Sequence, residues 1–260
     1  MLEHLFPNQL ARGVVECLIA ALTAIAVIVL ARRRAPDLLK EVPLAQLRGL
    51  LQIVAVGAIL AALLHGPQWT SIFVLVGMVF AAASIVRKRA KQIPGAFALA
   101  LIAIGVGAGS ILAIMTATGV IPLRILVLVP VGSMVIANTM NTQSLFLDRF
   151  RGEVLAHVGE IESALALGAS PEAAVARYLR AAFRSSLIPA VDNIRSLGIV
   201  WIPGIMAGMV LSGASPLFAA LYQFVVLSTI FSASALACFV ASYLVTKRIF
   251  SAHSQLLLRA

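Results

Sequence analysis

The 260-residue sequence is 61% hydrophobic and only 12% charged, whereas a soluble domain carries about 25% charged residues. A chain with so few charges cannot cover itself with polar surface, and its mean hydropathy of +1.03 indicates an integral membrane protein. The net charge of +10 comes from basic residues that flank apolar runs, a distribution that excludes a separate nucleic-acid-binding domain.

Seven apolar runs approach the roughly 20 residues that an α-helix needs to cross the hydrocarbon core. The runs lack the alternation of a membrane β-barrel, so we expect an all-α polytopic membrane protein with residues 1–260 in one transmembrane domain. The basic residues 32–34 follow the first run, which favours a retained first helix over a cleaved signal peptide. The predicted spans are 14–31, 49–64, 69–86, 94–116, 123–146, 189–211 and 216–246.

Lysine and arginine gather on alternate connections between these spans. The opposite connections include "HGPQ" and "SGAS", which have no basic residue, and a third loop that offers only Arg124. Because cytoplasmic loops carry the excess of positive charge, we expect seven crossings of the cell inner (plasma) membrane, with the N-terminus outside and the C-terminus inside. Residues 35–48 fit either a short helix on the cytoplasmic surface or a plain linker.

Residues 148–188 form a charged insert that we expect to be a cytoplasmic helical hairpin. Its first helix has an apolar face of Leu155, Val158, Ile161 and Leu165 and ends at Gly168. The second helix begins with Ser170 as N-cap, then Pro171 and Glu172, and has an apolar side of Val175, Leu179 and Phe183. A solvated loop that only spaces two spans is the alternative.

Catalytic motifs are missing from the sequence. It contains no G-x-x-x-x-G-K-[ST], H-E-x-x-H, C-x-x-C or G-x-S-x-G, and its four histidines are scattered. We therefore predict no catalytic residue and no cofactor on this chain, and the sequence leaves any metal ligand unknown.

Several polar or helix-breaking residues at membrane depth are candidates for a translocation path. Pro203 should kink or break the sixth span, and Gly204 and Gly208 have the spacing that permits close helix approach. Either tight packing or a flexible path segment explains them, whereas packing is favoured for Gly105 and Gly109. The other candidates are Glu16, Asn138, Asn141, Gln143, Met206 and Met209.

These candidates have alternative explanations. The amides, which we expect at the cytoplasmic end of the fifth span, fit an inner vestibule or an interface equally well. Methionine in an apolar helix usually fills space, although Met206 and Met209 would offer thioether contacts to a soft metal. Glu16 near the outer end of the first span is either functional or a headgroup-level acid.

Two blocks carry a resemblance to a known family. "VPVGSMVIANTMNTQSLFLDRF" and "SLGIVWIPGIMAGMVLSGASPLFAALYQFVVLSTIFSASAL" resemble the FetB-type permeases of ABC transporters, a family that includes bacterial iron-export and plant aluminium-tolerance membrane proteins. "EIESALALGAS" also resembles the E-A-A-x-x-x-G coupling motif of ABC permeases, matched at Glu162, Ala164 and Gly168, with Ser163 at its middle alanine.

The resemblance implies a permease subunit that exports iron or another metal ion. It implies a separate ATPase subunit that binds ATP and Mg, a second copy of this chain, and coupling of the two through the insert. From the residues alone, an ion-coupled secondary transporter or channel is the first alternative. A membrane assembly or regulatory factor is the second.

Overall fold

The computed structural model describes residues 9–32, 36, 38–63, 67–90, 92–251 and 255–258. Over these residues the chain forms nine helices and two isolated β-bridges. Six of the described helices are long and apolar enough to cross a membrane, which confirms the prediction of an all-α polytopic membrane protein. The chain divides into two compact units, Met1–Gly66 and Pro67–Ala260.

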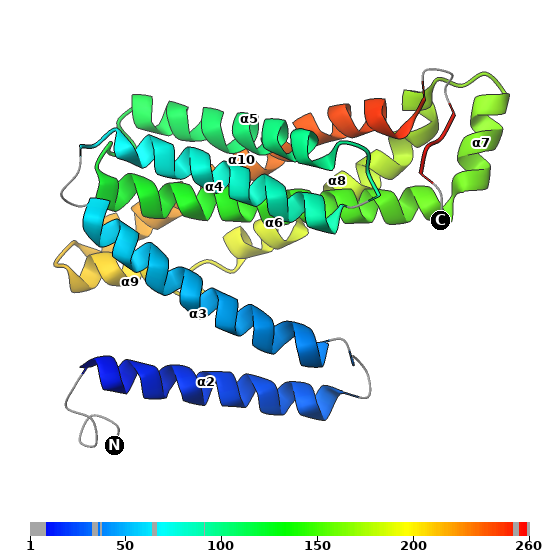
Figure 1. The fold of residues 1–260 in the computed structure, drawn as a ribbon. Helices are drawn as coiled ribbons and strands as arrows, with labels where there is room; N and C mark the ends of the chain where they lie inside the picture. The colour runs from blue at the N-terminus through cyan, green and yellow to red at the C-terminus, as the bar shows by residue number, and fades with distance from the viewer. Residues whose placement is uncertain are drawn as a thin grey trace. The chain divides into compact units, whose positions relative to one another are not determined.

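The first unit contains α2 (Gln9–Ala31) and α3 (Leu38–Leu63), which pack against each other (Figure 1). Their candidate spans are Ala11–Leu30 and Glu41–Ile59. Residues 38–48, expected as a surface helix or a linker, form the start of α3. The linker is therefore wrong over residues 38–48, whereas the helix is confirmed there as the first turns of a longer helix. Residues 33–35, 37 and 64 of the predicted elements lie outside the described residues.

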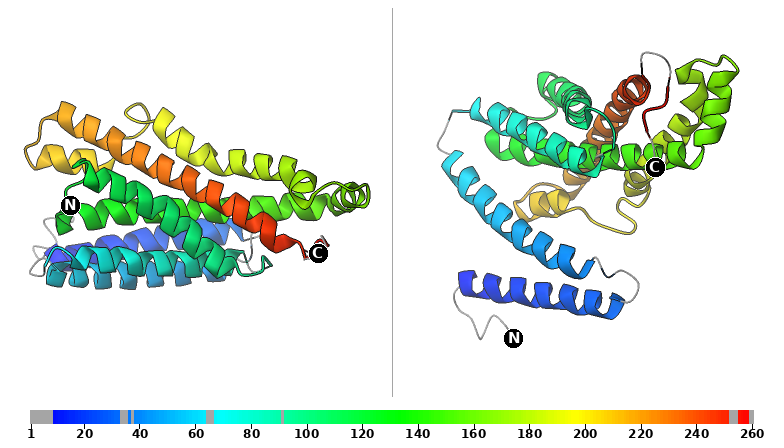
Figure 2. Two further views of the ribbon diagram at one scale, coloured as in Figure 1. Left: turned by 90° about the horizontal axis from the view of Figure 1, so that it is seen from above. Right: turned by 45° about the vertical axis from the view of Figure 1, so that its right-hand side comes forward.

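The second unit is a helical bundle whose helices run between two ends (Figure 1). The C-terminal turns of α4, α6 and α10 lie at one end with α7, and both views of Figure 2 agree. We name this the basic end, because it carries Arg87, Lys88, Arg89, Arg151, Lys247 and Arg248. The helices are α4 (Thr70–Arg89), α5 (Ala96–Ala117), α6 (Ile125–Ala156), α7 (Val158–Ala166), α8 (Pro171–Arg195), α9 (Gly204–Leu211) and α10 (Pro216–Ile249).

The predicted sixth span, 189–211, is not one helix. Helix α8 runs through Pro189 to Arg195, an irregular segment follows, and α9 begins at Gly204 with Pro203 as its N-cap residue. The predicted break at Pro203 is therefore confirmed. Proline has no backbone N–H, so it cannot donate the hydrogen bond that would join it to the preceding helical turn. Together α8 and α9 run from the basic end to the opposite end, where α10 begins (Figures 1 and 2).

The predicted fifth span ends too early. Helix α6 passes Phe146 and continues to Ala156, so it has 32 residues and contains the first part of the predicted insert. Leu155 consequently belongs to α6 and not to the first hairpin helix. Because a helix keeps its hydrogen bonds after it leaves the hydrocarbon layer, the end of an apolar run does not mark the end of the helix.

Small residues bring α5 close to α10 in the core. A Cβ atom on Gly107 would lie 2.6 Å from the Cβ of Ala237 and 2.7 Å from the carbonyl oxygen of Ala233. At Gly105 and Gly109, by contrast, a Cβ would meet no described atom within 4 Å. The expectation that Gly105 and Gly109 are packing glycines is therefore wrong within this unit, and Gly107 has that role.

Candidate functional site

The interior of the second unit contains polar side chains that have no hydrogen-bond partner among the described residues. Both amide atoms of Gln143 on α6 and of Gln223 on α10 are buried in this way. Each glutamine is almost completely buried. Leaving a buried polar group unpaired costs about 1–3 kcal/mol, so these amides need water or a ligand to satisfy them. The hydroxyls in the same condition belong to Thr139, Ser144, Tyr222 and Ser234.

These groups are spread along the depth of the bundle. Helices α6 and α10 pack against each other and both run toward the basic end (Figure 1). At a rise of about 1.5 Å per residue, Gln223 lies about 10 Å along α10, whereas Gln143 and Ser234 lie about 27 Å along their helices. The buried polar groups therefore lie at several heights along the helix axes and do not form one isolated layer.

The other predicted amides differ from Gln143 in their surroundings. Asn138 donates from Nδ2 to the Met134 carbonyl oxygen at 2.8 Å and is half-buried, whereas Asn141 is exposed. Because α6 extends to Ala156, all three lie well before the C-terminal end of the helix. Only Gln143 of the three points its amide into the unpaired interior.

Four of the other predicted path residues lie on helix α9, and Pro203 is its N-cap residue. Pro203 is buried, Met206 and Met209 are half-buried, and Gly204 and Gly208 are exposed. A Cβ on either glycine would meet no described atom within 4 Å. Close packing within the described chain therefore does not explain this glycine pair.

Glu16 belongs to the first unit, on α2. Its carboxylate accepts a hydrogen bond from Arg12 Nε at 2.9 Å, and its side chain is half exposed. This i,i+4 pair near the start of α2 satisfies the carboxylate locally, as expected for an acid at the level of the headgroups.

The insert contains two consecutive helices, as predicted: α7, and an α8 that continues beyond the insert to Arg195. We call α7 and α8 together the hairpin. Gly168, with φ of +89°, donates its N–H to the Leu165 carbonyl at 3.0 Å and closes the end of α7. Ser170 Oγ accepts from the Ala173 N–H at 3.2 Å, and Pro171 is the first residue of α8. The predicted caps are therefore confirmed.

The two faces of α7 differ. Ile161 is completely buried, and Val158 and Leu165 are partly buried, so one face packs on the bundle. Glu162 and Ser163 are exposed, Ala164 is half-buried, and Leu167 at the turn is 89% exposed. Glu162 and Leu167 are therefore both accessible at the solvent-exposed side of the hairpin.

Polar contacts fix α7 to α8. Arg177 Nη2 donates to the hydroxyl of Tyr178 at 2.6 Å and to the carboxylate of Glu160, and the Tyr178 hydroxyl donates to Glu160 Oε2 at 3.2 Å. The hydrogen bond with Tyr178, aided by the charge of Glu160, raises the pKa of Arg177 above its ordinary value. The ring of His157 also stacks on Tyr178, with ring centroids 4.9 Å apart.

Acidic, histidine and cysteine side chains do not gather into a metal site in the part of the chain that the structure describes. Over the described residues, no three of them lie close enough together to hold a metal ion. Cys17 and Cys238 are free.

Sequence reasoning missed Gln223 and the buried hydroxyls of Thr139, Ser144 and Ser234. The signal for Gln223 was present, because it is the one amide in the 34-residue apolar helix α10 and polar residues at membrane depth are costly. The hydroxyls gave no comparable signal, since serine and threonine in a helix usually bond to their own backbone.

Known relatives support the family resemblance that the sequence shows. Residues 14–250 match the uncharacterised protein family UPF0014. The chain belongs to this family. It is 31% identical over 210 residues to the "Probable iron export permease protein FetB" of Escherichia coli, covering 80% of this chain and 81% of that protein. It is 32% identical over 219 residues to the membrane protein YjkA of Bacillus subtilis, covering 84% and 87%.

A plant relative extends the comparison. The chain is 26% identical over 247 residues to the protein ALUMINUM SENSITIVE 3 of Arabidopsis thaliana, covering 94% of this chain and 90% of the relative. No solved structure matches the chain. The family and the six candidate spans together establish a multi-pass membrane protein related to a permease.

Proposed function

We propose that this chain is the membrane-spanning subunit of an ABC transporter that exports a metal ion, with iron as the first candidate. The iron assignment rests on the name of the relative FetB. The observation that carries the ABC assignment is the hairpin of α7 and α8, which presents an exposed surface at the basic end. The sequence has no phosphate-binding loop, so ATP and Mg would be bound by a separate ATPase subunit.

The surface for the ATPase consists of Glu162 and Leu167, next to the turn at Gly168. In ABC permeases a short cytoplasmic helix docks into a groove of the ATPase, and α7 has the length, the packed inner face and the exposed outer face for that role. The contacts of Arg177 with Glu160 hold α7 on α8, so a displacement of α7 would be passed to the longer helix. Since α8 leads into the break before α9, motion of the hairpin would reach the membrane interior.

The charge distribution supports a cytoplasmic location for the hairpin. Most of the described lysines and arginines of the second unit lie toward the basic end, whereas Arg195 ends α8 and Arg124 stands beside the start of α6 at the opposite end. If α8 and α9 together form one discontinuous crossing, the chain crosses seven times. The N-terminus then lies outside and the C-terminus inside, as the positive-inside rule predicts.

The route for the ion would pass through the polar interior that Gln143 and Gln223 line. A metal ion without a cluster of acidic, histidine or cysteine ligands would be held by amide and hydroxyl oxygens, water, or groups from a second copy of the chain. Oxygen ligands suit hard cations better than the thioethers of Met206 and Met209 do.

The irregular segment between α8 and α9 supports a dimer. Ile199 and Val200 are 85% and 79% exposed, and the segment interrupts a predicted span. Irregular backbone is not stable in contact with lipid, because its polar groups need partners that hydrocarbon cannot offer. A second permease copy would cover it, giving two permeases and two ATPases.

Co-purification of the chain with a candidate ATP-binding-cassette ATPase tests this proposal. The variant Leu167→Ser should weaken the association at least about fivefold, as expected when an apolar anchor of an interface is lost. Leu211→Ser is the matched control, because Leu211 is also 89% exposed but lies at the end of α9, opposite the basic end. Equal association of both variants with the ATPase would contradict the proposed surface.

A further inference from the structure

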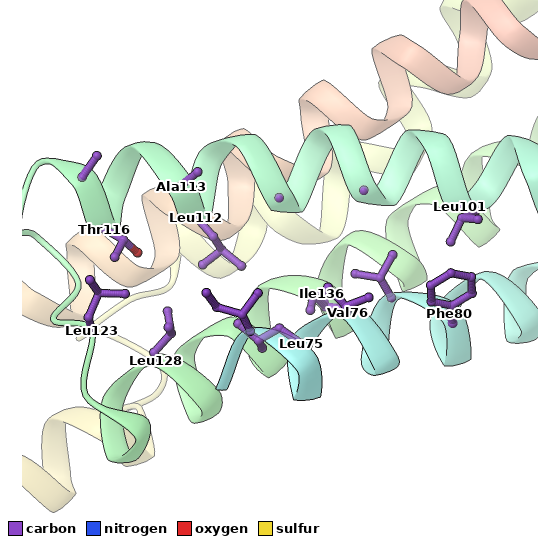
Figure 3. Close-up of a pocket in the computed structure, with 15 residues that line it drawn as sticks. Leu75, Val76, Phe80, Leu101, Leu112, Ala113, Thr116, Leu123, Leu128 and Ile136 are labelled. Carbon is purple, nitrogen blue, oxygen red and sulfur yellow. The ribbon is translucent and has the colours of Figure 1, made fainter. Parts of the chain in front are cut away.

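A groove runs between α4 and α5, on the side of the second unit away from the α5–α10 contact. It encloses about 740 Å³ and is lined by three helices and one loop residue, among whose side chains only that of Thr116 is polar. Phe80, Leu101 and Leu112 lie along it (Figure 3). Gly105 and Gly109 of α5 also line it and have no side chain to fill it. Its volume falls in the range of about 300–1,000 Å³ that ligand sites have.

The groove lies at membrane depth and opens outward. Both α4 and α5 are candidate spans, and Phe80 and Val76 on its edge are about half exposed. A surface of this kind, in the hydrocarbon layer and without polar groups, suits an acyl chain.

A second pocket, of about 620 Å³, lies where α4 ends and α5 begins. Arg87 lines it, together with the first residues of α5, Ala96 and Phe97. The free N–H groups in the first turn of a helix favour an anion. None of the residues that line this pocket is acidic.

Two more guanidinium groups are anchored at the wall of this pocket. Arg248 donates from Nη1 to the Gly95 carbonyl oxygen at 2.8 Å, and Arg151 donates from Nε to Gln92 Oε1 at 2.5 Å. Each guanidinium has five N–H groups, and within the described residues no ion pair joins Arg87, Arg151 or Arg248 to a carboxylate. The pocket therefore has an excess of positive charge.

The two pockets lie on the same faces of the two helices. Arg87 follows Phe80 by two helical turns, and Phe97 precedes Leu101 by one turn, so each pair is on one side of its helix. The apolar groove thus continues toward the basic pocket, as the chains of a phospholipid continue toward its headgroup.

We propose that the α4–α5 face binds an anionic phospholipid, with the headgroup phosphate in the basic pocket and an acyl chain in the groove. Charge complementarity selects this occupant, because basic pockets between membrane helices on the cytoplasmic side bind anionic headgroups. The site is independent of the proposed transport function, since it needs only a bilayer.

Quantitative native mass spectrometry of the purified full chain tests the site, with dioleoyl phosphatidylglycerol as the probe. Dioleoyl phosphatidylcholine, with the same chains, and glycerol 1-phosphate, with no chain, should bind clearly more weakly. Arg87→Gln should reduce the affinity for phosphatidylglycerol about fivefold, the loss expected for one cationic contact at a membrane surface. Arg180→Gln is the control, because Arg180 is an exposed arginine of α8 outside both pockets.

Filling the groove tests the acyl-chain part. Gly105→Leu should also weaken binding, whereas Gly77→Leu should not, because Gly77 is an equally open glycine of α4 that does not line the groove. Gly109→Leu replaces Gly105→Leu if the latter does not fold. Equal affinity for both phospholipids, or full affinity in the groove-filling variants, would overturn the proposal. A loss of dimer mass in these variants with lipid affinity unchanged would assign the groove to a second copy instead.

Discussion

The α6–α10 interior and the α7–α8 hairpin differ in whether their polar groups have hydrogen-bond partners. In the hairpin, Ser170, Arg177 and Glu160 all have hydrogen-bond partners, so the structure is satisfied in one arrangement. In the interior, Gln143 and Gln223 have none among the described residues. In the proposed transporter this difference corresponds to two mechanical roles: a rigid hairpin that would transmit motion, and an interior that water or solute would complete.

The largest effect should come from the tight contact that borders the interior. Gly107→Leu would force α5 away from Ala237 on α10, and overpacking of this kind costs about 1–3 kcal/mol or more. Thermal unfolding in detergent should show the loss, with Gly105→Leu, on the open side of α5, changing the stability by about 0.5 kcal/mol or less. Equal losses for both variants would mean that the interior is not closely packed, and its unpaired amides would need no special explanation.

Replacing an unpaired amide should stabilise the protein. Gln143→Leu removes a buried group that lacks a partner, and the gain should be about 1–2 kcal/mol in unfolding free energy. The same variant should lose transport, because the proposed path loses an oxygen ligand. Asn141→Leu on the exposed side of α6 is the control and should give no gain. A destabilised Gln143→Leu would show that the amide is already well satisfied, and the contrast with the hairpin would disappear.

In the hairpin, by contrast, removing a polar group should lower the stability, because that group has a hydrogen-bond partner. Ser170→Ala removes the N-cap of α8, which should cost about 1 kcal/mol. Hydrogen exchange of the first turn of α8 measures this loss locally. Ser163→Ala serves for comparison, since Ser163 Oγ donates back to the Gly159 carbonyl at 2.7 Å within the helix and its removal should change little. Unaltered exchange in Ser170→Ala would indicate that the hairpin does not depend on its cap.

The smallest effect is expected at Glu16. Its pair with Arg12 is solvent-accessible, and such pairs contribute about 0–1 kcal/mol. Glu16→Gln should leave both the melting temperature and transport nearly unchanged. A severe loss of transport with normal stability would indicate that Glu16 belongs to the translocation path. It would also weaken the assignment of that path to the polar interior.

The sequence predicted most accurately the features that local backbone chemistry determines, namely helix caps and a helix break. The caps at Gly168 and Ser170 and the break at Pro203 follow from backbone conformations that particular residues impose. The number of long spans was less predictable, because α8 passes through Pro189 and α6 continues beyond its apolar run. Hydropathy reports which residues suit lipid, but it does not report where a helix ends.

The candidate site was predicted only in part, because it depends on which faces of the helices meet. Gln143 was recognised as a polar group at membrane depth, but Gln223 gained its meaning only from burial in the α10 interface. Similarly, Gly105, Gly107 and Gly109 are indistinguishable in sequence. Only the packing of α5 on α10 makes Gly107 the contact and leaves the other two along the groove.

Iron uptake into inside-out vesicles tests the central proposal most directly. The chain would be reconstituted with its candidate ATPase, and radioactive iron inside the vesicles would be measured with and without ATP. We predict accumulation that requires both the ATPase and ATP and that Leu167→Ser reduces while Leu211→Ser does not. Iron movement that persists without the ATPase or without ATP would contradict the account and favour a transporter or channel that works alone.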